Sequence, residues 1–220
     1  EHGKRYERAR EFLEVVSGLW DSWEDGALEQ NKEEGRYADP CRIHAIDHKG
    51  AYFRVAGPLN IPRSPQGRPV FIQAGTSAAG KQLAAETAEV VFTAFEDKES
   101  SIAYYNELKS MLPRFFRAGR QLKVMPGLFV NIGSTEREAR ERENEFNELI
   151  SPLAGVNYLS KLLNADLSGY PLDEPLPKLP REGNTSRAVM IMERAEATGL
   201  TLRELGRHYA VARGHLSLTG

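Results

Sequence analysis

The stretch Pro69–Gly80, PVFIQAGTSAAG, decides how the rest of the chain is arranged. Its first half, Val70 to Ala74, is mostly apolar or β-favouring and predicts a strand buried on both faces. A turn of small residues follows, and the alanine-rich pattern KQLAAETAEV then predicts a helix over 78–89. A strand, a small-residue turn and a helix start together point unpaired backbone N–H groups at an anion.

The turn residues themselves suit a phosphate group. Gly75 lets a ligand approach the backbone closely, and Thr76 and Ser77 can cap the helix or donate hydroxyl hydrogen bonds. In an α/β barrel, a turn of this kind at the C-terminal end of a strand is where a phosphorylated cofactor sits. An ordinary strand-to-helix loop with a good N-cap has the same pattern, and the turn alone favours that simpler interpretation.

The segments on either side alternate between helices and strands. Apolar periodicity predicts helices over 4–23 and 98–118 and strands over 90–95 and 123–133, with a break at Pro126-Gly127. The capping-box pattern Thr135-x-x-Glu138 predicts a further helix over 135–150, whose many charges indicate a solvated face. This alternation predicts a parallel sheet with right-handed crossovers. Three strands are too few to close a barrel, which needs eight.

The chain before this sheet carries two histidine patterns. His2 and Tyr6 begin the first helix four residues apart, where they could meet a phosphate or a flavin ring, although spacing alone favours surface residues at a frayed end. Residues 24–42 read as a long loop, and 43–56 predict a hairpin around Lys49-Gly50. His44 and His48 would lie roughly 13 Å apart on that strand, too far to share a metal ion, so no metal site is predicted.

The pattern changes after Ser151. A helix is predicted over 151–163, followed by a proline-rich segment whose leucines favour packing over disorder, so that 151–185 is a candidate lid. Thr185 or Ser186 caps a helix that Gly199 ends, and Thr201 caps another. Residues 200–220 superficially resemble a DNA-binding helix-turn-helix, but the slightly acidic net charge of the chain does not favour binding to DNA. Arg213 and His215 are weak candidates for substrate contact, and solvent exposure explains them more simply.

Composition excludes several classes of function. The net charge of −2 gives no general attraction to nucleic acid or anionic membranes, and 40% apolar residues are ordinary for a globular protein. The single cysteine, Cys41, excludes an internal disulfide and fits a reducing compartment. No apolar run could span a bilayer, and EHGKRYERAR lacks the apolar core of a signal peptide, which favours the cytoplasm. Both ends read as cuts inside a longer protein.

Several ordered segments together resemble one family. RYERAREFLEVVSGLWDSWEDGAL, the stretch from ADPCRIHAIDHKG to PVFIQAGTSAAG, AAETAEVVFTAF, LSGYPLDEPLPKLP and GLTLRELGRHYAVARGH resemble the bacterial luciferase-like FMN-dependent monooxygenases, in the nitrilotriacetate, EDTA and dibenzothiophene-sulfone monooxygenase class. The resemblance implies an α/β fold. This would be a partial TIM (β/α)8 barrel, incomplete at both ends, with a late helical and irregular insertion. Residues 1–150 would form the central part of the barrel, including the hairpin excursion at 43–56. Residues 151–220 would hold the insertion and the helices leading to a missing last barrel unit.

The resemblance also implies a cofactor and its contacts. Reduced FMN would be the co-substrate, delivered by a separate NAD(P)H:flavin oxidoreductase. Its contacts would come from His2, Tyr6 and Ser77, with Gly75 and Thr76 in the same turn. His2 would also be the candidate catalytic residue. We expect residues 1–220 alone to bind FMN more weakly than micromolar.

The activity implied is oxygenation of a small organic, possibly xenobiotic, substrate by reduced FMN and O2 in a homo-oligomeric enzyme, without nucleic acid or membrane partners. Alternatives on the same barrel are a deazaflavin-dependent oxidoreductase and a non-catalytic flavin-binding protein. A remote alternative is DNA binding by residues 200–220.

Overall fold

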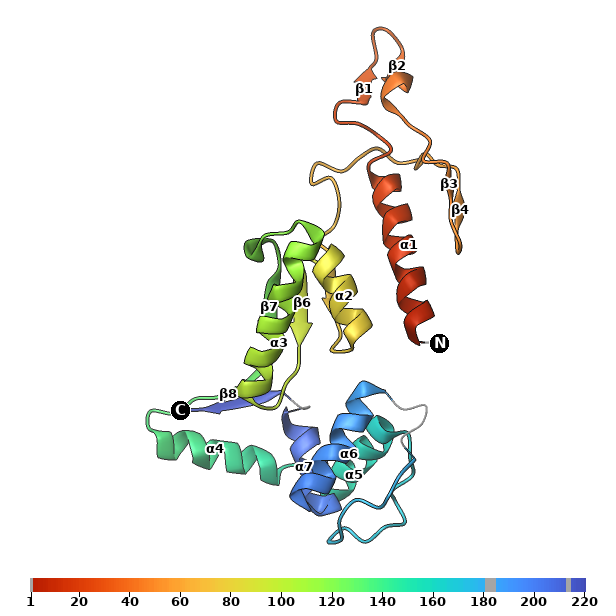
Figure 1. Cartoon of the computed structure of the whole chain (residues 1–220). Coiled ribbons are helices and arrows are strands. Elements are labelled where there is room, and N and C mark those ends of the chain that lie inside the picture. Colours follow the sequence, from red (N-terminus) through yellow and green to blue (C-terminus); the bar gives the residue numbers. More distant parts are fainter. Residues whose placement is uncertain (1, 181–184, 213–214) are drawn as a thin grey trace.

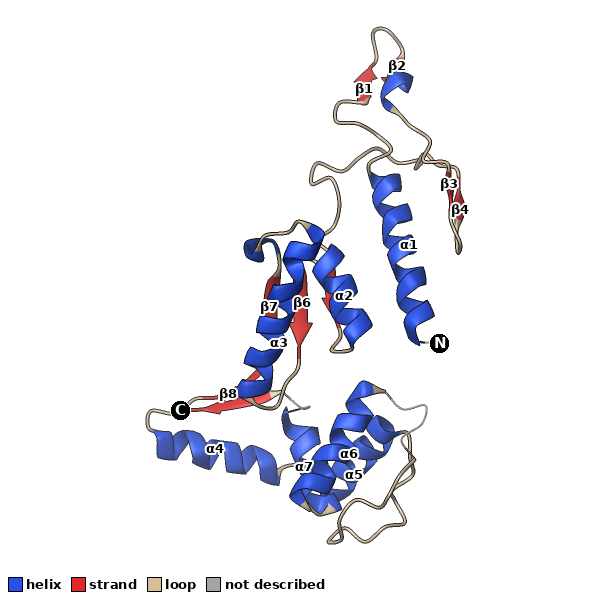
Figure 2. Cartoon of the chain, in the orientation of Figure 1, coloured by secondary structure: helices blue, strands red, loops and turns tan. Residues whose placement is uncertain are grey.

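The structure is a computed structural model that describes residues 2–180, 185–212 and 215–220. It is a mixed α/β arrangement in three parts (Figure 1). One helix with two small hairpins forms an arm at one end, a parallel sheet with its covering helices lies in the middle, and a group of helices lies at the other end. Figure 2 shows that the helices and the parallel strands alternate through the middle part, as the sequence predicts.

The parallel sheet begins with the three adjacent strands β5 (Ile72–Ala74), β6 (Val90–Thr93) and β7 (Lys123–Pro126). A second parallel pair joins β8 (Leu128–Asn131) to β9 (Leu216–Thr219). β7 and β8 are the two halves of the predicted strand 123–133, and each half pairs with a different neighbour. Gly127 N donates to Thr93 O across the break at 2.7 Å. The strands therefore form one wall of an incomplete barrel.

The last residues of the chain form a strand that the sequence did not predict. The sequence was expected to give only helices here before a missing barrel unit, whereas 216–219 form β9. Its pairing partner lies more than 80 residues earlier, so no local turn or hairpin signal identifies it.

Two helices cover one face of the sheet. α2 (Ala78–Thr87) and α3 (Lys98–Met111) pack there over a fully buried Val91. The helix predicted over 98–118 ends early, because Pro113 has no N–H to continue it, and a 3-10 turn, η2 (Leu112–Phe115), follows. Another 3-10 turn, η3 (Gly119–Gln121), leads into β7. The buried residues of this core are Ala84, Ala85, Ala88, Val91, Tyr104, Leu108, Leu112 and Leu122.

The opposite face of the sheet is open, which contradicts the expectation of a strand buried on both sides. Ile72 is 67% exposed and Val70 is 50% exposed. Successive side chains of a strand point to opposite faces, so one set packs under the helices and the alternate set has no cover in this part of the chain. Phe92, Met125, Leu128 and Val130 are exposed apolar residues from the following strands.

The arm consists of α1 (His2–Trp20) and the two hairpins. β1 (Leu28–Asn31) pairs with β2 (Arg36–Ala38), and the 3-10 turn η1 (Pro40–Arg42) follows, so the prediction of a plain loop over 24–42 was wrong. The hairpin predicted within 43–56 is confirmed but shorter, with β3 (His48–Lys49) paired to β4 (Arg54–Val55).

Glu11 of α1 holds the second hairpin in place. Its carboxylate accepts hydrogen bonds from the backbone N–H groups of Tyr52 and Phe53 and lies 3.1 Å from His48 Nε2. Burial opposes its charge, but the hydrogen bonds from His48 and these amides outweigh burial and lower the pKa of Glu11. His44 Nε2 lies 2.7 Å from Glu24 Oε1 instead, so the two histidines contact different carboxylates.

The third part contains α4 (Glu136–Glu148), α5 (Pro152–Leu163), α6 (Ser186–Thr198) and α7 (Leu202–Ala212). Thr135, Thr185 and Thr201 cap three of these helices as predicted, and Gly199 ends α6 at φ +65°. We call α5, α6, α7 and the leucine-bearing segment 165–179 the helical cluster, since they share one core. Leu167 is fully buried in it, as the composition of this segment predicts.

Two glycines let α5 and α7 cross closely. A Cβ atom added at Gly206 would lie 2.8 Å from the carbonyl carbon of Gly155, and one added at Gly155 would lie equally close to Gly206. The two backbones therefore touch where the helices cross. One face of α7 is buried against α5, with Leu205 and Tyr209 in the shared core.

Candidate functional site

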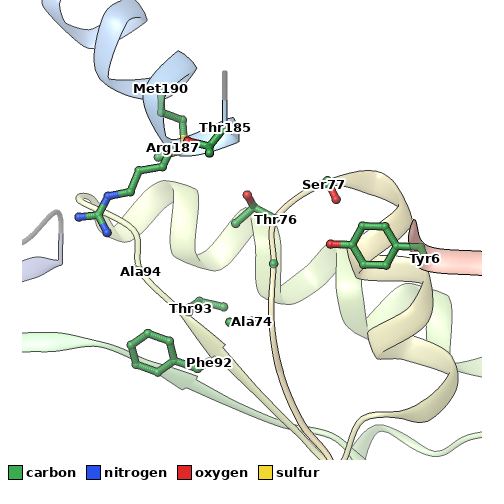
Figure 3. Close-up of a pocket in the computed structure, with 11 residues that line it drawn as sticks. Tyr6, Ala74, Thr76, Ser77, Phe92, Thr93, Ala94, Thr185, Arg187 and Met190 are labelled. Atoms are coloured by element: carbon green, nitrogen blue, oxygen red, sulfur yellow. The ribbon is translucent and has the colours of Figure 1, made fainter. Parts of the chain in front are cut away.

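A cavity of about 360 Å³ lies at the C-terminal ends of β5 and β6 (Figure 3). It is bounded by the turn before α2, the end of β6, the first turn of α6 and one side chain from α1. Its lining residues are Tyr6, Ala74, Gly75, Thr76, Ser77, Phe92, Thr93, Ala94, Thr185, Arg187 and Met190. Four of the five residues predicted to bind flavin are therefore gathered at one cavity.

The turn from Gly75 to Ser77 is held by three hydrogen bonds. Ser77 is the N-cap of α2, and its hydroxyl accepts from Gly80 N at 3.2 Å. Gln73 of β5 donates to Gly80 O at 2.8 Å, and Tyr104 of α3 donates to Gly75 O at 2.9 Å. These contacts fix the N-terminal end of α2 beside the cavity, where a helix offers backbone N–H donors to an anion.

Tyr6 reaches this turn from α1. A Cβ atom added at Gly80 would lie 2.8 Å from the Tyr6 hydroxyl oxygen, and one at Gly75 would lie 3.4 Å from it. The hydroxyl thus rests against the helix start. An ion pair of 2.7 Å between Arg10 and Glu86 ties α1 to α2. The absence of side chains at both glycines makes the approach possible.

His2 begins α1, but its side chain lies outside the part of the chain that the structure describes. Its predicted role as a flavin contact and as a catalytic residue therefore stays a prediction. The backbone of α1 nevertheless brings its N-terminal end toward this region, because Tyr6 lies one helical turn after His2.

Sequence reasoning missed several residues of this site. Tyr104 lies in the helix predicted over 98–118 and was given no role of its own, yet its buried hydroxyl donates to Gly75 O. Burial, then the charges of Glu107 and Tyr6, raises the pKa of Tyr104 to about 12, so it remains a donor at neutral pH. Phe92, Arg187 and Met190 were not singled out, because they reach the cavity only through long-range packing.

A buried carboxylate beside the cavity joins the sheet to the helical cluster. Glu96, two residues after Ala94, forms an ion pair with Arg194 of α6 and lies 3.4 Å from His208 Nε2 of α7. Burial opposes the charge of Glu96, but the hydrogen bond with His208, the nearby Tyr209 hydroxyl and the charge of Arg194 lower its pKa overall. The group therefore stays ionised at neutral pH.

A second cavity of about 380 Å³ lies next to this ion pair, and His208 and His215 are among its lining residues. The ring of His215 lies 5.8 Å from that of Phe92, in an edge-to-face arrangement. His215 is therefore partly buried against the sheet, where sequence reasoning favoured solvent exposure. Arg213 lies outside the described residues.

Two further findings concern the part of the chain that the structure describes. Nowhere in it do three or more His, Cys, Asp or Glu side chains gather as a metal ion would require. None of its helices combines the length and apolarity needed to cross a bilayer.

The chain resembles known proteins in sequence. Residues 1–205 match the family model described as luciferase-like monooxygenase. The chain is 47% identical to N-acetyl-S-(2-succino)cysteine monooxygenase from Bacillus subtilis (strain 168), with 100% of the chain and 51% of that protein covered. It is 45% identical to nitrilotriacetate monooxygenase component A from Aminobacter aminovorans, with 100% of the chain and 49% of that protein covered.

Solved structures of similar proteins share the fold of this chain. The crystal structure of DmoA from Hyphomicrobium sulfonivorans matches with a TM-score of 0.83 and 27% identity, over 100% of this chain and 47% of DmoA. Riboflavin lyase RcaE, crystallised with modified FMN and riboflavin, matches with a TM-score of 0.80 and 31% identity, over 100% of this chain and 48% of RcaE. The chain thus spans about half the length of the proteins it resembles.

Proposed function

Since the chain belongs to the luciferase-like monooxygenase family, we propose that it carries the flavin-phosphate site of an enzyme that oxygenates a small organic substrate with reduced FMN and O2. The observation that carries the proposal is the meeting of Tyr6 with the capped start of α2 at one cavity. When bound, reduced FMN supplies the electrons for the reaction with O2.

The residues present fit a phosphate group. Gly75 and Gly80 place no side chain between the helix start and the Tyr6 hydroxyl, and the N-terminal N–H groups of α2 lie beside them. Thr76 and Ser77 add hydroxyl groups, and Tyr6 adds a phenol. Among the described lining residues there is no carboxylate to repel an anion.

We assign the chain's own residues the following parts. Tyr6, Thr76, Ser77 and the backbone at Gly75 bind the phosphate and so orient the flavin. His2 is the proposed hydrogen-bonding and catalytic residue at the start of α1. Phe92 and Met190 give the cavity an apolar wall that helps to exclude water from the reacting centre.

We propose a division of the chain on the same basis. Residues 1–150 would form the central barrel segment, and 151–220 the insertion with the returning strand β9. The segment 151–185 would act as a lid over the substrate. The exposed apolar face of the sheet supports the idea that further strands complete a barrel in the full-length protein, by which we mean the longer chain containing residues 1–220.

The proposed partner is a separate NAD(P)H:flavin oxidoreductase that delivers reduced FMN. One relative is named component A, and others are named subunits A and B of pristinamycin IIA synthase, which supports a divided system. We further propose a cytoplasmic homo-oligomer. N-acetyl-S-(2-succino)cysteine and nitrilotriacetate, for which two relatives are named, are the first substrates to try.

A flavin titration of the full-length protein tests the proposal. We expect Tyr6→Phe and Ser77→Ala each to weaken FMN binding about tenfold, because each removes a hydrogen bond to a charged group. Ser110→Ala, which removes an exposed serine hydroxyl of α3, is the matched control and should leave the affinity unchanged. Equal FMN affinity in all four proteins would refute the phosphate site.

Oxygen consumption separates the remaining alternatives. With a flavin reductase, NADH and a substrate, the proposed enzyme consumes O2 and yields an oxygenated product. A non-catalytic flavin-binding protein would bind FMN without this reaction. The absorbance spectrum of the bound cofactor would reveal a deazaflavin, and a mobility shift on duplex DNA would support the remote alternative.

A further inference from the structure

The first turns of α6 present one particular face to the cavity. Arg187 and Met190 line it, while Ala188 and Ile191 are buried in the core of the helical cluster. Arg194, seven residues or two helical turns after Arg187, lies on the same side of α6 and pairs with Glu96, which follows the end of β6 by three residues. This ion pair fixes the side of the helix that faces the sheet, and with it the position of Arg187.

Arg187 brings a positive charge to the cavity. Among the described residues that line the cavity, it is the one with a formal charge at neutral pH. A guanidinium group carries five N–H donors in a planar fork, so it can keep a contact within the chain and still offer two donors to a ligand. That fork matches the two oxygen atoms of a carboxylate.

The cavity has two separate places for negative charge. Figure 3 shows Arg187 extending from α6 on one side of the cavity, above Ala94, whereas Ser77 and Tyr6 lie on the other side. The flavin phosphate is assigned to the Ser77 side, where the start of α2 lies. An anion at Arg187 must therefore belong to another group, with Phe92 and Met190 offering apolar contacts nearby.

We propose that Arg187 binds a carboxylate of the substrate, so that the site selects small molecules bearing a carboxylate next to an apolar portion. The proposal rests on the proposed flavin function, because it takes the other side of the same cavity for the phosphate. It makes Arg187 a specificity-determining residue contributed by the helical cluster.

Binding of a simple carboxylate to the FMN-loaded full-length protein tests the inference. The probes are succinate and succinamide, in which neutral amides replace both carboxylates, and isothermal titration calorimetry measures their affinity. The proteins are the wild type, Arg187→Gln, Arg187→Lys and the control Arg137→Gln, which removes an equal charge from an 87% exposed side chain on α4. FMN affinity and the thermal midpoint are recorded for each.

We expect Arg187→Gln to weaken succinate binding at least about tenfold, the loss typical of a hydrogen bond to a charged group. Arg187→Lys should be intermediate, because it keeps the charge and loses the fork. Arg137→Gln should match the wild type, and succinamide should bind more weakly than succinate to the wild type alone. FMN affinity should stay within about twofold throughout.

Two results would overturn the inference. One is that the wild type and Arg187→Gln both bind FMN and either bind succinate with equal affinity or do not bind it at all. The other is a loss of FMN affinity on removing the guanidinium, which would assign Arg187 to the phosphate. Failure of the wild type to bind FMN would instead refute the proposed function. If Arg187→Gln lowers the thermal midpoint, Arg187→Lys decides the outcome.

Discussion

Replacing Gly80 with alanine tests how Tyr6 and the start of α2 form a site. The new Cβ would lie 2.8 Å from the Tyr6 hydroxyl oxygen and 3.1 Å from Ser77 Oγ. Ordinary contact begins at 3.4 Å, so the Tyr6 hydroxyl must withdraw by about 0.6 Å, the difference between 3.4 and 2.8 Å. Because this hydroxyl is the far end of a side chain, it can move away without displacing the backbone.

The two consequences of Gly80→Ala have opposite signs. Alanine within a helix is more favourable than glycine by up to about 1 kcal/mol, so the stability should stay equal or rise. FMN affinity should fall at least about tenfold, because a displaced phenol loses its hydrogen bond to the phosphate, typically worth about 1.5–3 kcal/mol. The variant would therefore bind its cofactor less well while folding no less stably.

Flavin fluorescence quenching and urea unfolding of the full-length protein measure the two effects. Gly119→Ala is the matched control, because a Cβ there meets nothing within 4 Å. Unchanged FMN affinity in Gly80→Ala would show that the phenol does not contact the phosphate. A loss of more than about 1 kcal/mol in stability would mean that the backbone, rather than Tyr6, takes up the added methyl group.

Two other predictions concern the helical cluster and its contact with Glu96. Gly206→Ala places a methyl group 2.8 Å from the Gly155 carbonyl carbon, where only backbone can yield, so we expect a loss of about 1–3 kcal/mol and faster amide hydrogen exchange in α5 and α7; unchanged exchange would contradict the close crossing. The lowered pKa of Glu96 means that its stabilising contribution is complete above its ordinary value of 4.5 and is lost as the pH falls through the lower folded value. Urea unfolding should show this acid-side loss in the wild type and a flatter profile in Glu96→Gln.

Local signals made part of this structure predictable. The N-cap at Ser77, the caps at Thr185 and Thr201 and the left-handed stop at Gly199 all lie within a few residues of the elements they define. The turn at Gly75 was identified in the same way. Its contact with Tyr6 came from the family resemblance, since the two lie about 70 residues apart.

The features that the sequence did not predict depend mainly on contacts between distant residues or on the backbone of polar turns. β9 has no recognisable partner in its own neighbourhood, and the hairpin within 24–42 depends on Gly35 at φ +66° and Gln30 at φ +50° in a polar segment. Arg187 meets the cavity only because α6 packs across the end of β6. The exposure of one face of the sheet could not be predicted, because an apolar strand has the same sequence whether or not another layer covers it.

The adjacency of β8 and β9 has an evolutionary consequence. The chain leaves the sheet after Asn131 and returns at Leu216 to lie directly beside the strand it left. Everything between these points can be lengthened, shortened or exchanged while the strand register is preserved. Descendants of one ancestral barrel could acquire new substrate preferences by replacing this segment as a unit, leaving the proposed flavin site at Gly75–Ser77 unchanged.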